Sequence, residues 1–276
     1  MNVYEIVTEQ IVKSLEAGVI PWKKPWNGGH EPKSWSTKKV YRGINYFLLA
    51  CSKHQGEFWF TYNQVKKLGG YVTGAGTPIV YWNFIEKEEI DDNGKKKTSS
   101  VPFLRYYKVW NQEQVHDVDL NIDSHEETIE FEPIEEAEKV LSSYATCPVI
   151  KHEEQRAYYS PSQDIINLPK KETFHSVEQY YATAFHEAVH STSHETRLNR
   201  DLKGGFGKES YGKEELVAEL GSAFLCAKTG INSTIENQAS YIDNWIKAIK
   251  GDSKLIVTAS GKAQKAVDYI LGEEKE

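Results

Sequence analysis

Two histidines four residues apart, with a glutamate beside the first, are the residues best suited to chemistry. The motif is His186-Glu187-Ala188-Val189-His190. On a helix, side chains four residues apart project from one face, so His186 and His190 can bind one Zn²⁺ at about 2.0–2.1 Å from each nitrogen. Glu187 can then take a proton from a water held at the metal. We therefore expect a zinc ion in this chain, with Glu187 as the catalytic base; the alternative is a helix with two surface histidines.

A catalytic zinc site needs a third protein ligand, which a second acidic helix expected over 213–228 can supply. Glu215 and Glu219 lie four residues apart on that helix and share a face. We assign Glu215 to the metal and Glu219 to holding a ligand histidine in position, and the reverse assignment stays open. His194 becomes a ligand only if the first helix breaks near Ser193. The candidates for the third ligand are Glu214, Glu215, Glu219 and His194.

The reaction that these residues predict is metal-assisted hydrolysis of an amide bond. Zn²⁺ would polarise the carbonyl and acidify its water, and Glu187 would pass the proton to the leaving amine. Tyr211, or His194 where it is not a ligand, could stabilise the oxyanion. The alternative for the glutamates is a solvated helix face, which is how most Glu-rich stretches are interpreted.

Several elements must position this chemistry. Ser176 and Gln179 form a capping box that starts a helix over 176–194. A hairpin is expected over 158–168, with its turn at 160–164, in the place where zinc peptidases often pair with the substrate backbone. Further helices are expected over 133–144, 238–249 and 260–271.

Charge and aromatic content divide the chain into two parts. Residues 1–115 hold 16 Lys/Arg, 11 Asp/Glu and six of the seven tryptophans, a net charge of +5, whereas the remaining residues have a net charge of −12. We expect an α+β protein of two domains, 1–115 and 133–276, joined by an acidic linker over 116–132. No apolar run approaches a membrane span, the N-terminus is no signal peptide, and three scattered cysteines favour a reducing compartment, so we expect a cytoplasmic protein with no membrane partner.

The first domain has the composition of a single-stranded DNA-binding surface. A helix over 3–17 and a hairpin with strands 77–84 and 103–110 predict a small α+β module with an antiparallel sheet. Aromatic side chains that stack on bases alternate with cations that contact phosphates, although any single aromatic is more often a core residue. The candidate DNA-binding residues are Trp22, Lys23, Lys24, Trp26, Lys38, Lys39, Tyr41, Arg42 and Trp82.

Several motifs together resemble the ArdC-type antirestriction proteins of plasmids and phages. In the first domain the resemblance is carried by PWKKPW, YRGINYFLL, TYNQVKKLGG and VYWNF, and in the second by YYSPSQDIINLP, HEAVHSTSHETRLNR and EELVAELGSAFLCA. The resemblance implies an N-terminal single-stranded DNA-binding domain. It also implies a mostly helical, zincin-like metallopeptidase domain with a short sheet. It further implies a protein that shields incoming single-stranded DNA from restriction.

Three functions of different classes are compatible with these patterns. In the first, a peptidase tethered to single-stranded DNA cleaves an unknown protein substrate. In the second, DNA binding is the whole function and zinc is structural. In the third, the protein is a peptidase whose first domain binds a protein partner. Glu187 separates the first two, because a structural zinc site does not need it.

Overall fold

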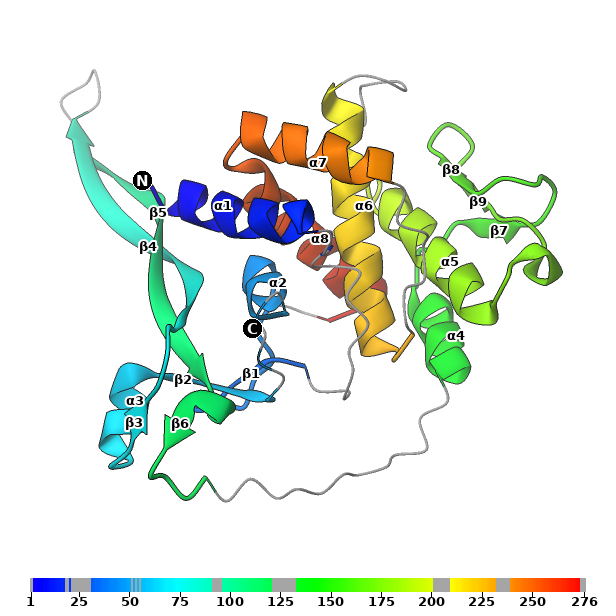
Figure 1. Cartoon of the computed structure of the whole chain (residues 1–276). Coiled ribbons are helices and arrows are strands. Elements are labelled where there is room, and N and C mark those ends of the chain that lie inside the picture. Colours follow the sequence, from blue (N-terminus) through cyan, green and yellow to red (C-terminus); the bar gives the residue numbers. More distant parts are fainter. Residues whose placement is uncertain are drawn as a thin grey trace.

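The computed structural model describes residues 2–17, 20, 31–50, 52, 54, 56–90, 96–120, 133–200, 209–231 and 239–273. The chain is an α+β protein of two domains, as the sequence predicted. The longest strands belong to the first part, and long helices dominate the second (Figure 1). Within these ranges, none of the helices has the length and apolar character that a membrane crossing requires.

The first part of the chain is built on a four-stranded sheet in the order β1-β2-β5-β4. Its strands are β1 (Lys33–Ser34), β2 (Phe58–Thr61), β4 (Thr77–Ile90) and β5 (Lys96–Asn111). β4 and β5 form the predicted antiparallel hairpin, which stands at one side of the molecule (Figure 1). Both strands are longer than predicted, because the backbone ladder continues past the apolar stretch. Residues 91–95, between the two strands, lie outside the described residues.

Shorter elements surround this sheet. The apolar segment after Gly43 forms helix α2 (Ile44–Ala50). The Asn45 side chain holds α2 to the outer edge of β4, because it accepts from the Val80 amide and donates to the Val80 carbonyl, both at 2.7 Å. Helix α3 follows β2, and two short strands form a separate pair. Their bounds are α3 (Tyr62–Lys67), β3 (Tyr71–Val72) and β6 (Val115–His116).

The second part, as far as it is described, contains a small sheet beside five helices. The predicted hairpin is present as β8 (Tyr158–Ser160) and β9 (Ile165–Asn167), and β7 (Val149–Lys151) adds in parallel to give the order β7-β9-β8. The two central helices carry the candidate metal ligands. The helices are α4 (Pro133–Ser143), α5 (Val177–Ser191), α6 (Glu209–Lys228), α7 (Ala239–Gly251) and α8 (Leu255–Leu271). Of the predicted linker, residues 121–132 lie outside the described ranges.

Helix α5 begins where predicted and ends earlier. The Ser176 hydroxyl accepts a hydrogen bond from the Gln179 amide at 3.2 Å, which satisfies one of the free amides of the first turn. The helix stops at Ser191 rather than His194. The hydroxyls of Ser191, Thr192 and Ser193 each donate to the carbonyl three residues earlier, which competes with the helical pattern.

One hydrophobic core joins the two parts of the chain. Helix α1 (Val3–Glu16) belongs to the first part by sequence but packs on α7, with Val7 and Ile11 buried in the same cluster as α5, α6 and α8. From α2, Phe47 packs on Phe224 of α6, with ring centroids 4.6 Å apart. The predicted domains are therefore continuous through their apolar contacts, which sequence composition does not show.

Candidate metal centre and nucleic-acid interface

Three candidate metal ligands converge between α5 and α6. One ligand atom from each of His186, His190 and Glu215 lies within 4.8 Å of the other two. The two Nε2 atoms are 3.1 Å apart, and the Glu215 carboxylate lies 3.5 Å from His186 Nε2 and 3.3 Å from His190 Nε2. Two imidazole nitrogens and one carboxylate oxygen match the protein ligands of a catalytic zinc-type site, in which water or substrate takes the fourth position.

The electrostatics of this cluster favour a bound cation. Burial would raise the pKa of Glu215, but hydrogen bonds from His186 and His190 outweigh burial and hold that pKa well below its usual range. Burial opposes charge on His190 too, yet Glu214 and Glu215 raise its pKa to about 10. The carboxylates thus favour positive charge at both imidazoles, and the same negative charge favours a divalent cation between them.

Glu187 is placed beside the ligands, as its position in the motif requires. Its side chain is buried, and its charge favours the protonated forms of both His186 and His190. A carboxylate beside the ligands of a catalytic metal can accept a proton from a water bound at that metal. Glu219 interacts electrostatically with His186, which is consistent with a positioning role.

An ion pair that the sequence analysis missed supports His190. Glu214 Oε1 lies 3.7 Å from His190 Nδ1, and the Glu214 carboxylate receives two hydrogen bonds from Arg200 at 2.6 and 3.2 Å. Arg200 also donates to the Val189 carbonyl at 2.8 Å, which ties it to the end of α5. The sequence held one signal, because Glu214 was among the candidate ligands, but nothing in the spacing pointed to Arg200.

His194 lies outside the ligand cluster. Because α5 ends at Ser191, the chain turns before His194, whose Nδ1 is 2.8 Å from the Thr196 hydroxyl. The turn is braced by Arg197, which makes two hydrogen bonds to Asp164 at 2.8 and 2.7 Å and one to the Ser191 carbonyl. The side chain of Tyr211, the other oxyanion candidate, is outside the described residues.

Of the five described candidate DNA-binding residues, Lys38, Lys39, Tyr41 and Arg42 line one pocket, whereas Trp82 lies on the hairpin. Lys38 lies over the Trp35 ring at 3.1 Å, and Arg42 is held by Asp268 at 2.5 Å. Tyr41 is partly buried, and burial raises the pKa of its hydroxyl to about 12. Trp82 is 49% exposed and free to stack. Four of the candidates lie outside the described residues: Trp22, Lys23, Lys24 and Trp26.

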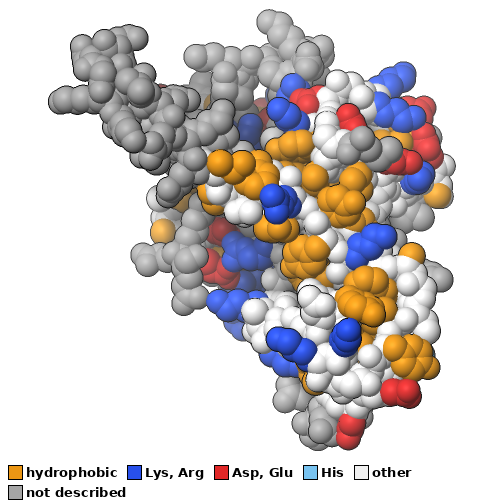
Figure 2. Space-filling view, turned by 90° about the vertical axis from the view of Figure 1, so that its left-hand side faces the viewer, with side chains coloured by type: hydrophobic (Ala, Val, Ile, Leu, Met, Phe, Trp, Pro, Cys, Tyr) orange, Lys and Arg blue, Asp and Glu red, His pale blue; other side chains and the backbone are white. Residues whose placement is uncertain are grey.

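An exposed aromatic face lies on the hairpin. Of the twelve large hydrophobic side chains that are exposed among the described residues, six lie on the hairpin strands: Tyr81, Trp82, Phe84, Ile85, Tyr106 and Tyr107. Tyr81 and Tyr107 lie on one face of the hairpin with ring centroids 5.6 Å apart, and Arg105 is paired with Tyr81 in the register. Figure 2 shows hydrophobic side chains separated by Lys and Arg on this side of the molecule. The alternation of side chains along each strand places these three residues on one face, but only once the pairing of β4 with β5 is known.

Comparison with known proteins agrees with both parts of this description. Residues 1–110 match the family model of the N-terminal domain of anti-restriction factor ArdC, and residues 135–262 match that of a zincin-like metallopeptidase, a domain that implies a metal. The chain is 37% identical over 99% of its length to the DNA primase TraC of Escherichia coli, but covers only 27% of that protein. A second Escherichia coli TraC is 36% identical and is covered to 20%.

Relatives of similar length are matched from end to end. The uncharacterized protein y4eC of Sinorhizobium fredii is 32% identical over 100% of this chain and 93% of its own. The metal-free crystal structure of the antirestriction protein ArdC from plasmid R388 has a TM-score of 0.80 and 35% identity, covering 99% of this chain and 98% of ArdC. Its Mn(II)-bound structure has the same TM-score at 33% identity and the same coverage. The chain therefore belongs to the ArdC family of antirestriction proteins.

Proposed function

We propose that this protein is a zinc metallopeptidase that binds single-stranded DNA, and that it protects the incoming DNA of a mobile element from restriction. The observation that carries the peptidase activity is the convergence of His186, His190 and Glu215 with Glu187 buried beside them. The aromatic face of the hairpin supports the DNA-binding activity.

The residues of the chain divide the hydrolytic work. A zinc ion held by His186, His190 and Glu215 would supply a Lewis acid for the scissile carbonyl and lower the pKa of a water. Glu187 accepts the proton of the attacking water and delivers it to the leaving amine. Strand β8 is an edge strand that contacts α5, so an extended peptide can add to its open side.

A peptide-library digest with wild type and Glu187→Gln tests the peptidase. We expect both proteins to retain about one zinc per chain by metal analysis, because Glu187 is not among the ligands, and only wild type to cleave. Equal cleavage by both proteins would contradict the role of Glu187. Cleavage by neither, with zinc bound, would favour a structural zinc site in a DNA-binding protein.

The DNA interface is tested by fluorescence anisotropy of a labelled single-stranded oligonucleotide. Stacking on an aromatic side chain contributes about 1–3 kcal/mol per base, so Tyr81→Ala and Tyr107→Ala should each weaken binding roughly tenfold. Arg105→Ala should also make the affinity less dependent on salt, because a phosphate contact is lost.

Lys247→Ala on α7 is the matched control for Arg105→Ala. Its side chain is exposed on a helix away from the hairpin, so neither affinity nor salt dependence should change. If Tyr81→Ala, Tyr107→Ala and Arg105→Ala all bind as wild type does, the hairpin face is not the DNA site. A peptidase whose first part binds a protein partner would then be favoured.

A further inference from the structure

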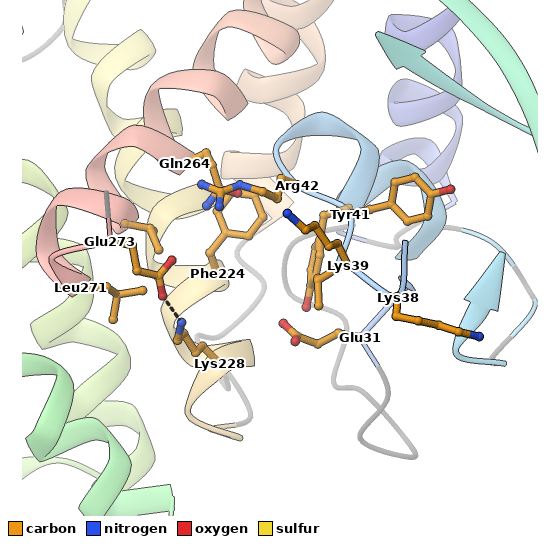
Figure 3. A pocket seen from close by; sticks show the side chains of 13 residues that line it. Glu31, Lys38, Lys39, Tyr41, Arg42, Phe224, Lys228, Gln264, Leu271 and Glu273 are labelled. Carbon is orange, nitrogen blue, oxygen red and sulfur yellow. Dashed lines mark hydrogen bonds and ion pairs between the residues drawn. The ribbon is translucent and has the colours of Figure 1, made fainter. Parts of the chain in front are cut away.

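A cavity of about 480 Å³ lies between the two parts of the chain, away from the metal ligands. Residues 31–46 form one wall, and α6 and α8 form the other (Figure 3). We call it the Phe224 pocket, after the ring near its centre. Its volume lies in the usual range for a site that holds one small molecule.

The wall contributed by the first part is fixed by a polar network. Arg42 donates to Asp268 at 2.5 Å, Gln264 donates to the same carboxylate at 3.1 Å, and the Gly43 amide donates to Gln264 at 3.1 Å. Asp268 is 6% exposed, so this carboxylate is a buried anchor rather than a surface contact. The pocket is therefore preorganised, which reduces the entropic cost of binding.

Cations approach the pocket from both walls. Lys39 and Arg42 come from the first part, and Lys228 comes from α6, where it pairs with Glu273 (Figure 3). The Arg42 side chain is 55% exposed and uses only Nη2 for Asp268 among the described residues. Its other N–H groups can donate to an oxyanion, and guanidinium and ammonium groups together suit phosphate.

The rest of the pocket does not suit a bare anion. The Phe224 ring forms an apolar wall that is backed by Phe47 and Tyr46, with ring centroids 4.6 and 5.4 Å away. The Glu31 carboxylate points into the same space (Figure 3), where it can accept hydrogen bonds from N–H groups. A ligand that satisfies all three features carries a phosphate, a flat apolar surface and N–H donors.

We propose that the Phe224 pocket binds one nucleotide unit, with its phosphate at Lys39 and Arg42 and its base against Phe224 and Glu31. The unit could be a free nucleoside monophosphate or the phosphate-bearing end of a DNA strand. Only the second source rests on the DNA-binding function proposed above. Glu31 favours bases with an exocyclic amino group, so cytosine should bind better than thymine.

Calorimetric titration of the full chain with deoxycytidine monophosphate tests the pocket. We expect deoxycytidine without phosphate to bind at least about tenfold more weakly, because charge-assisted hydrogen bonds are lost. Lys39→Gln should weaken the nucleotide to a similar extent. Lys66→Gln, an exposed lysine on α3 that does not line the pocket, is the matched control and should change nothing. Glu31→Leu should abolish the preference for deoxycytidine monophosphate over thymidine monophosphate.

Oligonucleotides with and without a terminal phosphate identify the source. If a strand end occupies the pocket, the phosphate should tighten binding in wild type but not in Lys39→Gln, and deoxycytidine monophosphate should compete for that gain. If only the free nucleotide binds, the pocket is a nucleotide site separate from the strand. The proposal is overturned if millimolar deoxycytidine monophosphate does not bind, or if Lys39→Gln and Glu31→Leu both bind it as wild type does. Binding of the oligonucleotide without a terminal phosphate tests the hairpin face separately from the pocket.

Discussion

Arg200→Met removes the cation that holds Glu214 beside the metal ligands. The Arg200 guanidinium makes two hydrogen bonds to Glu214, one to the Val189 carbonyl at 2.8 Å and one to the Thr192 hydroxyl at 2.6 Å. Both charged side chains are 8% exposed. Without Arg200, an ionised carboxylate is left buried without its main partner, so we expect a loss of about 3–5 kcal/mol in the free energy of unfolding.

The same substitution should weaken the metal site. The Glu214 carboxylate lies 3.7 Å from His190 Nδ1 and helps to orient this ligand. Loss of a partner that orients a ligand side chain typically lowers metal affinity by about 10–100-fold. Adding Glu214→Gln to Arg200→Met removes the unpaired charge, so stability should recover in part while zinc affinity stays low. Recovery of stability without recovery of zinc affinity would show that Arg200 and Glu214 position His190 and are not only structural.

Urea denaturation in chelator measures the stability term, and competition with a chromophoric chelator measures zinc affinity. Arg156→Met is the matched control, because Arg156 also pairs with a glutamate but is exposed; it should leave both measurements unchanged. The reasoning is refuted if Arg200→Met costs less than about 1 kcal/mol and binds zinc as wild type does.

Three further substitutions test how the fold holds these sites. Gly221→Ala places a Cβ 2.7 Å from Val189 Cγ2 between α5 and α6, so it should cost about 1–3 kcal/mol in urea denaturation despite better helix propensity; a gain in stability would contradict this packing. Asn45→Ala should cost about 1–3 kcal/mol and speed hydrogen exchange at Val80, whereas unchanged exchange would show that α2 does not depend on this contact. Hydrogen bonds from Arg197 hold the pKa of Asp164 below its usual range, so this pair stabilises the fold above pH roughly 4 and loses its effect as pH falls through the lower folded pKa; Asp164→Asn should flatten the acid limb of the stability curve, and an unaltered limb would refute the linkage.

Local spacing was sufficient for the centre of the candidate metal site. His186 and His190 share a helix face because they are four residues apart, and Glu215 is brought to them by one helix–helix contact. The α+β class and the ArdC family were likewise predictable, because long alternating strands and extended motifs are local properties. The predicted end of α5 was three residues too late. Three successive hydroxyl side chains donate to backbone carbonyls there and compete with the helical hydrogen bonds.

Contacts between distant segments could not be predicted. Arg200 reaches Glu214 across the ends of two helices, and neither residue type signals that a partner exists. The guanidinium of Arg42 pairs with Asp268, 226 residues away, and nothing in the sequence around Arg42 indicates that partner. The face shared by Tyr81, Arg105 and Tyr107 depends on the register of a hairpin whose tip lies between them, and register is a property of two strands rather than one.

Helix α6 carries residues of both the candidate metal site and the Phe224 pocket. Glu215 is in its first half at the metal ligands, and Phe224 and Lys228 are in its second half at the nucleotide pocket. Phe224 also packs on α2, whose Asn45 holds the edge of the hairpin proposed to bind DNA. A displacement of α6 would therefore move residues at the metal ligands, at the Phe224 pocket and at the edge of the hairpin, because packed cores transmit displacement. Binding of DNA and of metal should be measured in the full chain, since residues 1–115 alone would expose the apolar faces of α1 and α2 that α6, α7 and α8 cover.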